Sequence, residues 1–203
     1  MLQEFDLDLV QVTDLYYVNA FSKTVKYLLS LDPDRLVAGF QAVSQGKDPQ
    51  HEPDIGLYGG WEDCWSLLRG HTMGHYLTAM AQAYKQSSDC DLKTELKQRL
   101  DYTVNQLKTC QDAHSNGYLF ASPENHFDII EGKATGKHWV PWYTMHKIIA
   151  GLVAVYNYTD NHTALEVATR LGDWVYGRTA KWDEALQRRV LNIEYGGIND
   201  ALY

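Results

Sequence analysis

The chain has too few basic residues to bind a nucleic acid through charge. Its 203 residues include 18 Lys and Arg against 26 Asp and Glu, which gives a formal net charge of −8, and the basic residues form no stripe. Nucleic-acid binding depends on basic side chains that neutralise phosphates. We therefore expect no nucleic-acid partner. The acidic balance favours solubility but names no substrate.

Cysteine is also scarce. The three cysteines, Cys64, Cys90 and Cys110, are odd in number and form no CxxC pair. The cysteines therefore predict no disulfide framework and favour a reducing compartment. The first ten residues, MLQEFDLDLV, lack the basic start and the apolar run of a signal peptide. Together these features predict a cytoplasmic protein.

The sequence has no apolar run near the ~18 residues that a membrane span needs, so we expect no membrane partner. It does have 45% hydrophobic and 12% aromatic residues, enough for one domain with a core over residues 1–203. The aromatic residues are mostly Tyr and Trp, 14 and 6 against 5 Phe. Such amphipathic rings suit a concave, solvated surface that stacks on a ligand.

Helical periodicity runs through most of the chain. Apolar residues recur at helical spacing over 11–30, and Asp32 followed by Pro33 indicates the start of another helix. Residues 45–60, rich in Gly, Pro and Asp, predict a loop. Beyond them we expect nearly apolar helices at 71–85 and 142–157, amphipathic helices at 91–110 and 163–178, and a loop at 112–138. A capping box formed by Thr163 and Glu166 predicts the start of the last helix.

These helices repeat as two pairs. Tyr84 and Tyr156, which end the nearly apolar helices, are 72 residues apart. A helix that is apolar all round is buried all round, whereas an amphipathic helix coats the outside. The alternation predicts an all-α protein with inner and outer helices, an α/α barrel. A TPR-like solenoid fits less well, because its repeat is about half as long. A third unit opens at 194–203, so we expect a piece of a longer protein.

The segment 71-HTMGH-75 places His71 and His75 on one helical face. Zinc proteases use this spacing in H-E-x-x-H, where the Glu acts as general base. Thr72 stands at that position here and no third ligand is in view, which disfavours a zinc site. The remaining interpretations are that the histidines line a pocket, or that at least one packs in its wall with a hydrogen bond to the backbone.

Aromatic and acidic residues gather at the same helix starts. Trp61 is followed by Glu62 and Asp63, and a carboxylate beside an indole can hold a sugar. The alternative interpretation is a surface acid beside a packing tryptophan. In the second pair, 138-HWVPWYTMHK-147 brings rings and imidazoles to the matching helix start, where an α/α barrel would bring them to one mouth. The third unit adds Glu194, Asn199 and Asp200. Most glycoside hydrolases use two carboxylates, and the candidates by type are Glu62, Asp63, Glu194 and Asp200.

The sequence resembles one family over long, ordered motifs: YGGWED, LRGHTMGHYLTAMAQAY, HWVPWYTMHKIIAGLVAVY, ALEVATRLGDWVYGR and LNIEYGGINDALY. They are similar to glycoside hydrolase family 127, formerly DUF1680, typified by β-L-arabinofuranosidases. The resemblance covers nearly the whole chain. It implies a catalytic (α/α)6 barrel, of which this chain looks like a truncated first half. It also implies hydrolysis of terminal L-arabinofuranosyl or related plant sugars.

The same resemblance implies a zinc-bound cysteine nucleophile and a glutamate acid/base in the complete enzyme, beyond residue 203. The catalytic residues of this chain are thus unknown, and no metal or cofactor is expected within it. Its expected partner is a carbohydrate substrate, held by a pocket wall. The expected substrate-binding residues are Trp61, Glu62, His71, His75, Trp142, Tyr143, His146, Glu194 and Asn199.

A half barrel leaves apolar faces open, so we expect the 203-residue chain alone to be inactive and to associate with itself through those faces. Two other interpretations stay open. One is a non-catalytic helical module that binds a carbohydrate or another partner. The other is a different α/α-toroid sugar enzyme, such as an epimerase or an unsaturated-glucuronyl hydrolase.

Overall fold

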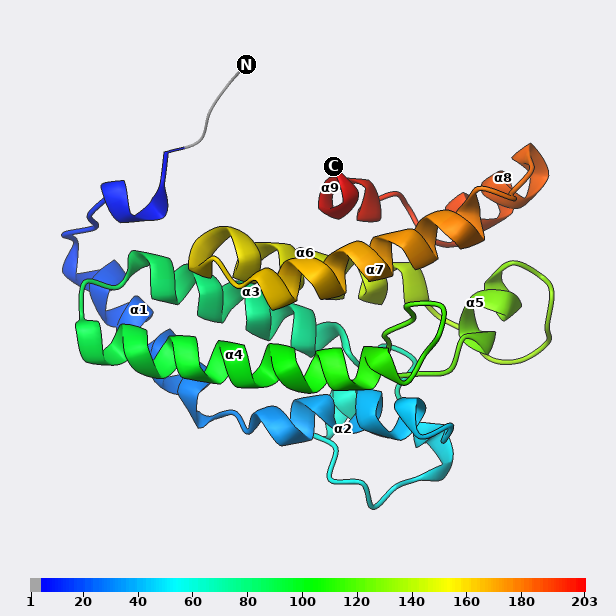
Figure 1. Ribbon diagram of the computed structural model, residues 1–203, viewed down its shortest axis with the longest axis horizontal. Coiled ribbons are helices and arrows are strands. Elements are labelled where there is room, and N and C mark those ends of the chain that lie inside the picture. The colour runs from blue at the N-terminus through cyan, green and yellow to red at the C-terminus, as the bar shows by residue number, and fades with distance from the viewer. Residues whose placement is uncertain (1–4) are drawn as a thin grey trace.

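Helices are the only regular secondary structure in residues 5–203, the part of the chain that the computed structural model describes. This confirms the all-α class. The α-helices are α1 (Leu15–Ser30), α2 (Pro33–Ser44), α3 (His71–Gln86), α4 (Cys90–Asp112), α5 (Asn125–Ile130), α6 (Pro141–Thr159), α7 (His162–Thr179), α8 (Glu184–Ile193) and α9 (Ile198–Leu202), joined by the 3-10 turns η1 (Leu7–Leu9), η2 (Pro49–His51) and η3 (Gly60–Glu62) (Figure 1).

The four expected helices of the two pairs are confirmed as α3, α4, α6 and α7, with ends that differ by one or two residues. The start of α2 is confirmed too, because the Asp32 side chain accepts a hydrogen bond from the Asp34 amide at 2.9 Å. Two short helices were not predicted. One is α5, inside the segment expected to be a loop, and the other is α8, whose one buried residue is Val190.

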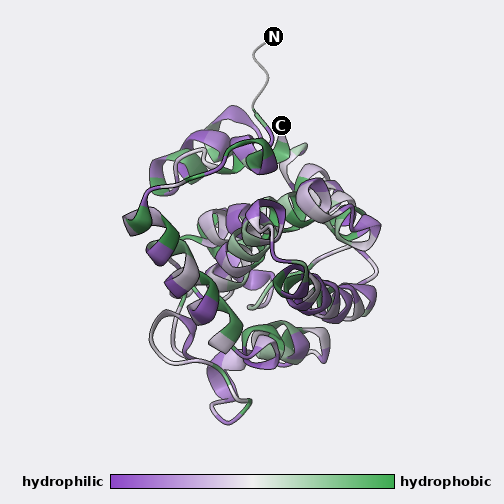
Figure 2. Cartoon of the chain, turned by 90° about the vertical axis from the view of Figure 1, so that its left-hand side faces the viewer, coloured by the Kyte–Doolittle hydropathy of each residue, from purple (hydrophilic) through white to green (hydrophobic). Residues whose placement is uncertain are grey.

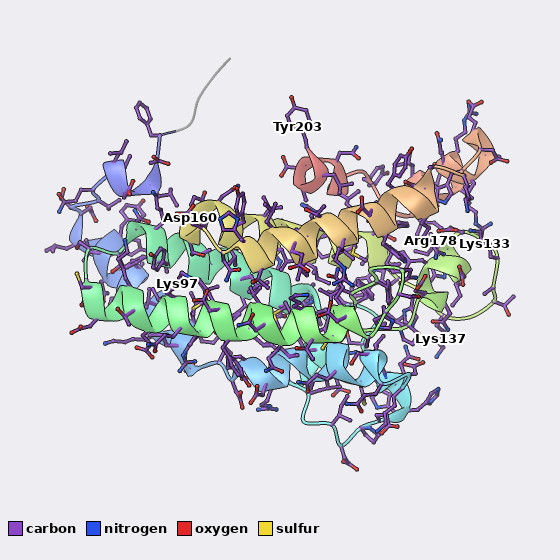
Figure 3. The ribbon with its side chains drawn as sticks, viewed as in Figure 1. Lys97, Lys133, Lys137, Asp160, Arg178 and Tyr203 are labelled. Atoms are coloured by element: carbon purple, nitrogen blue, oxygen red, sulfur yellow. The ribbon has the colours of Figure 1, made fainter. Side chains whose placement is uncertain are left out.

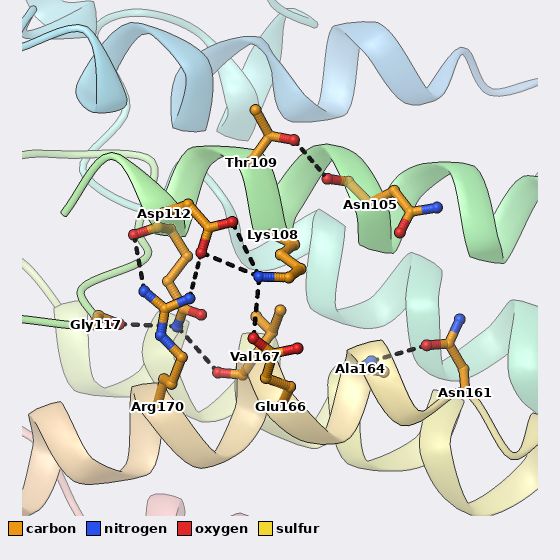
Figure 4. Close-up of polar contacts among 11 residues, drawn as sticks. Asn105, Lys108, Thr109, Asp112, Gly117, Asn161, Ala164, Glu166, Val167 and Arg170 are labelled. Atoms are coloured by element: carbon orange, nitrogen blue, oxygen red, sulfur yellow. Dashed lines mark hydrogen bonds and ion pairs between the residues drawn. The ribbon is translucent and has the colours of Figure 1, made fainter. Parts of the chain in front are cut away.

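The predicted capping box at Thr163 is wrong. The N-cap of α7 is Asn161, whose side-chain oxygen accepts a hydrogen bond from the Ala164 amide at 2.8 Å (Figure 4). Asparagine caps a helix at least as well as threonine does, so the helix begins at the earlier residue. Glu166 is thereby free to pair with Lys108 of α4, at 3.0 Å.

The helices α3 and α6 pack against each other at backbone distance. A Cβ atom on Gly74 would overlap the backbone carbonyl of Lys147, and one on Gly151 would lie 2.7 Å from the Gly74 oxygen. Because Gly70 faces Thr144 and Gly151 faces Leu77, the two helices run parallel. Their N-terminal ends therefore lie at the same end of the molecule.

The amphipathic helices α4 and α7 cover this central pair from outside. The face of α4 that turns inward carries leucines and a valine that are fully buried: Leu96, Leu100, Val104 and Leu107. Outside the core, α4 and α7 are joined by ion pairs from Asp112 to Arg170 and from Lys108 to Glu166 (Figure 4). Figure 2, which views the helices roughly end-on, shows hydrophilic and hydrophobic residues mixed along each of them, as expected of helices that bury one face.

The expectation that the nearly apolar helices are buried on all sides is wrong. Neither α3 nor α6 is buried on all sides within residues 5–203. His75 and Gln82 form an exposed stripe on α3, and Tyr143 and Asn157 lie on a corresponding stripe of α6. The side chains at these positions are polar and tolerate contact with water. A count of the apolar residues in each helix did not reveal this exposure. No helix among the described residues is long and apolar enough to cross a membrane.

Ion pairs on α7 fix α5 beside the start of α6. Arg178 contacts Asp128 and Glu131, each at 2.5 Å, and Lys133 contacts the other oxygen of Glu131. Figure 3 shows Arg178 and Lys133 on the same side of the molecule, next to α5. The contacts hold Phe127 of α5 against the aromatic core.

The glycine contact between α3 and α6 makes a stability prediction. Gly74→Ala forces a methyl group into the Lys147 backbone, and overpacking of this kind typically costs about 1–3 kcal/mol. Gly172→Ala is the matched control, because Gly172 lies in α7 and its Cβ would meet nothing within 4 Å. Gly172→Ala should leave the free energy of unfolding unchanged or raise it by up to about 1 kcal/mol. Urea unfolding followed by circular dichroism measures both, and equal effects would contradict the backbone contact.

Candidate functional site

The N-terminus of α3 is capped by a glutamate from outside the helix. Gly70 precedes α3 with a positive φ of 98° and has no side chain to cap it. The Glu62 carboxylate takes that role, accepting hydrogen bonds from the Gly70 amide at 2.6 Å and the Thr72 amide at 2.9 Å. Hydrogen bonds to a charged acceptor are worth about 1.5–3 kcal/mol each, and a helix N-terminus favours negative charge. Glu62 therefore fixes the loop before α3 to the helix.

The N-terminus of α6 is capped in the same way by Glu194. Val140 precedes this helix without a capping side chain, and Pro141 has no amide hydrogen to offer. The two oxygens of Glu194 accept from the Trp142 amide at 3.2 Å and the Tyr143 amide at 2.8 Å. Both parallel helices thus begin at a buried carboxylate from outside the helix, and Glu194 comes from a distant part of the chain.

The two carboxylates differ in their pKa values. Burial raises the pKa of Glu62, but hydrogen bonds from His71, Thr72 and the Gly70 amide outweigh burial and lower it below the ordinary value of 4.5. Burial also raises the pKa of Glu194, and there only two backbone amides oppose it, so the pKa rises to about 7. Glu62 is therefore ionised at neutral pH, whereas Glu194 is partly protonated.

The rings beside Glu62 form a continuous row. His71 is buried, with Nδ1 3.0 Å from the Leu68 carbonyl and 2.9 Å from the Glu62 carboxylate. The sequence analysis allowed that one of the two histidines packs in the pocket wall with a hydrogen bond to the backbone, and His71 does so. The His71 ring contacts Trp61 on one side, at 5.7 Å between centroids, and His75 on the other, at 5.9 Å. His75 is exposed.

The start of α6 adds a second set of polar rings. Burial lowers the pKa of His146, as do Lys147 and His75, against an opposite effect of Asp200. Partial burial of the ring and the charge of Lys147 lower the pKa of His75 as well. Both imidazoles are thus neutral near pH 7. Lys147 also lies 4.9 Å above the Tyr143 ring, which is 40% exposed.

Three residues of the expected site have other surroundings. Trp142 is buried in the core, where its ring contacts Phe127 at 4.8 Å and Trp182 at 5.5 Å. Glu194 is buried under the amides of α6, as described above. Asn199 lies exposed on α9, beside Gly196. The structure therefore brings together Trp61, Glu62, His71 and His75 at the start of α3, and Tyr143 and His146 on α6, with Trp142 behind them.

Two cavities open at this end of the molecule. The larger lies between the segments that lead into α3 and α6, and the smaller lies between the segment before α3 and residues at the end of α1 and in α2. The smaller, the His71 cavity, measures about 280 Å³ and is lined by Tyr27, Tyr58, Trp61, Glu62, His71 and Thr72. The larger, the indole groove, measures about 630 Å³ and is lined by Trp61, Asp63, Trp65, Ser66, His138 and Trp139. Trp61 belongs to both. We call this end, residues 58–72 and 138–147, the mouth.

The mouth includes residues that the sequence analysis did not select, namely Tyr58, Trp65 and His138. A signal for Trp65 was available, because two tryptophans four residues apart in a loop are unusual for a core. Tyr58 gave no signal, since its role depends on the fold: its hydroxyl accepts a hydrogen bond from the Asp32 amide at 2.7 Å.

The mouth suits a neutral, hydroxyl-rich ligand. A neutral imidazole offers one donor and one acceptor, which match a hydroxyl group, and exposed indole and phenol rings stack on apolar faces. The residues do not fit a metal ion. No three His, Cys, Asp or Glu side chains among residues 5–203 are arranged to hold one. The Cys64 thiol instead donates a hydrogen bond to Asp63 at 3.1 Å. The mouth is therefore not the site of the zinc that the family resemblance implies.

The raised pKa of Glu194 predicts a loss of stability with rising pH. Between pH 4.5, the ordinary value, and about 7, the folded protein keeps a proton that the unfolded chain has released. The free energy of unfolding therefore falls as pH rises through this window, by at most about 1.4 kcal/mol per pH unit. Glu194→Gln removes this component. The free energy of unfolding of Glu194→Gln and of the unsubstituted protein can be measured by urea unfolding at pH 5, 6, 7 and 8. The advantage of the unsubstituted protein should shrink or change sign as pH rises.

Glu62→Gln is the matched control. The pKa of Glu62 is lowered, so its contribution is present above the unfolded value of 4.5 and is lost only as pH falls through the folded pKa. The free energy of unfolding of Glu62→Gln should differ from that of the unsubstituted protein by the same amount at every pH from 5 to 8. If Glu194→Gln and the unsubstituted protein change in parallel over that range, Glu194 does not carry the pKa shift.

Comparison with known proteins assigns the chain to a family. Residues 9–203 match the family model described as beta-L-arabinofuranosidase, GH127 catalytic domain. A search of curated proteins finds no match to the chain. The match spans nearly the whole sequence and includes both capped helices, their glutamates and the mouth between them. The chain therefore belongs to the GH127 β-L-arabinofuranosidase catalytic-domain family, a family of glycoside hydrolases.

Proposed function

We propose that this chain is part of a glycoside hydrolase that releases terminal β-L-arabinofuranosyl residues, and that the rings of Trp61, His71, His75 and His146 in its mouth bind the sugar to be released. The observation that carries the proposal is the row of rings at the start of α3, Trp61, His71 and His75, which lies beside His146 of α6. Membership of the family supplies the reaction class and a carbohydrate substrate.

The chemistry of the mouth supports a neutral sugar. His75 and His146 have lowered pKa values, so each presents a neutral imidazole to solvent at pH 7. A neutral imidazole serves one hydroxyl as donor and another as acceptor. Trp61, which is 67% exposed, offers a face for the apolar side of a sugar ring.

We propose further that the two helix pairs are consecutive units of an (α/α)6 barrel, the fold of this family's catalytic domain. The parallel inner helices α3 and α6, each followed by an antiparallel outer helix, support this arrangement. In such a barrel the loops before the inner helices meet at one end, which is where the mouth lies.

The two buried glutamates act in this proposal as positioning residues. Hydrolysis requires a carboxyl group that reaches the glycosidic oxygen and a nucleophile or water on the other side. Each oxygen of Glu62 and of Glu194 already accepts a hydrogen bond from a helix amide. We therefore assign neither carboxylate to bond cleavage, and we place the catalytic groups elsewhere in the enzyme.

Binding of the sugar tests the proposal without relying on turnover. Isothermal titration calorimetry with methyl β-L-arabinofuranoside should show binding at one site. His75→Ala and His146→Ala should each raise the Kd about tenfold, because each removes hydrogen bonds worth about 1–1.5 kcal/mol. The expected order is that the L-arabinofuranoside binds more tightly than its D enantiomer.

His114→Ala is the matched control, because His114 is a partly buried histidine with a lowered pKa that lies outside the mouth, beside Tyr118. It should leave the Kd unchanged. Absence of binding by the folded protein, or equal losses in all three variants, would exclude the mouth as the sugar site.

A further inference from the structure

Three tryptophans of the mouth remain exposed although nothing in the fold requires them to be. Trp61, Trp65 and Trp139 are 67%, 76% and 51% exposed. They come from the two segments that precede α3 and α6, and all three line the indole groove. A group of large apolar side chains held in water on one surface marks an interaction site.

The arrangement of the rings favours an extended ligand. Within residues 5–203 no two of these three indoles are in ring contact with each other; the one ring partner of Trp61 is His71. An aromatic cage for a cation needs several rings within about 6 Å of one point. Indoles spread along a groove of about 630 Å³ instead offer successive faces to a chain.

The loop that carries Trp61 and Trp65 is held rigidly. The buried guanidinium of Arg69 donates hydrogen bonds to the carbonyls of Asp63 and Cys64, at 3.0 and 2.7 Å. It also donates to the Ala121 carbonyl at 2.8 Å, which ties this loop to the neighbouring one. A surface that is ordered before the ligand arrives loses less entropy on binding.

The polar groups of the groove identify the class of ligand. Asp63 accepts hydrogen bonds from the Trp65 amide and the Cys64 thiol, both through Oδ1. Among the described residues Oδ2 has no partner, so it can accept from a hydroxyl. His138 adds a second polar group. An anionic chain would be repelled by Asp63, whereas the pairing of indole faces with a free carboxylate oxygen suits a neutral sugar.

The groove adjoins the His71 cavity, because Trp61 lines both. The His71 cavity, at about 280 Å³, lies just below the range of about 300–1,000 Å³ that is usual for pockets that enclose a drug-sized ligand. It suits one sugar residue, and the groove provides room for the next residue of a sugar chain.

We propose that the indole groove is a second subsite, which binds the neutral sugar residue to which the terminal arabinofuranosyl residue is linked. The proposal rests on the function proposed above for the mouth. On this proposal the substrate is the end of an oligosaccharide, and the protein recognises its last two sugars. Trp65 and Trp139 select the second of them.

Saturation-transfer NMR tests this with an L-arabinofuranosyl disaccharide and methyl β-L-arabinofuranoside. Saturating the aromatic protons of the protein should mark the protons of both sugar rings of the disaccharide. In the doubly substituted protein, Trp65→Ala with Trp139→Ala, the signal on the second ring should disappear. The disaccharide Kd should rise roughly tenfold, and the methyl glycoside Kd should change less than about twofold.

Tyr176→Ala is the control, since Tyr176 is a 73% exposed ring on α7 outside the mouth, and it should change neither affinity. Unchanged circular dichroism shows that the double variant is folded. If the methyl glycoside binds but the second ring receives no saturation, or the disaccharide Kd is the same in the double variant, the second subsite is excluded and the proposed function stands. If neither ligand binds the folded, unsubstituted protein, both proposals fail.

Discussion

The close contact between α3 and α6 determines where every candidate site residue lies. Gly74 and Gly151 allow the two helices to approach at backbone distance, and the parallel orientation brings both N-termini to one end. Any side chain at either glycine would separate the helices and move the two halves of the mouth apart. The rings of His75 and His146 come near each other, and Trp61 and Trp139 line one groove, because of this contact.

Each of these helix ends is completed by a carboxylate from outside the helix, and this is how the loops of the mouth are fixed. Glu62 joins η3 to α3, and Glu194 joins the end of α8 to α6. Each cap uses both carboxylate oxygens, but the two glutamates differ in pKa, since His71 and Thr72 add hydrogen bonds to Glu62 that Glu194 lacks. The capped backbone then presents histidines and indoles at its surface, which connects helix capping to ligand recognition.

Periodicity and local capping residues were enough to predict the main helices, because both signals act within a few residues. The caps of α3 and α6 could not be predicted, since Glu194 lies about fifty residues from the amides that it binds and Glu62 reaches α3 only after the chain turns at Gly70. Trp139 and Trp142 show the same limit. They are three residues apart in one motif, yet one faces solvent and the other packs on Phe127. Which of the two faces outward depends on where α6 begins and on the position of α5, which the sequence pattern did not reveal.

Backbone amide NMR during a titration with methyl β-L-arabinofuranoside tests most directly whether this packing builds a sugar site. We predict that the largest shift changes fall in two separate segments at once, around residues 58–75 and 138–147, and include the capped amides of Thr72 and Tyr143. We expect no comparable change at the interface of α4 and α7. Changes confined to one of the two segments, or concentrated on α4 and α7, would contradict the claim that the paired helix ends form one binding surface.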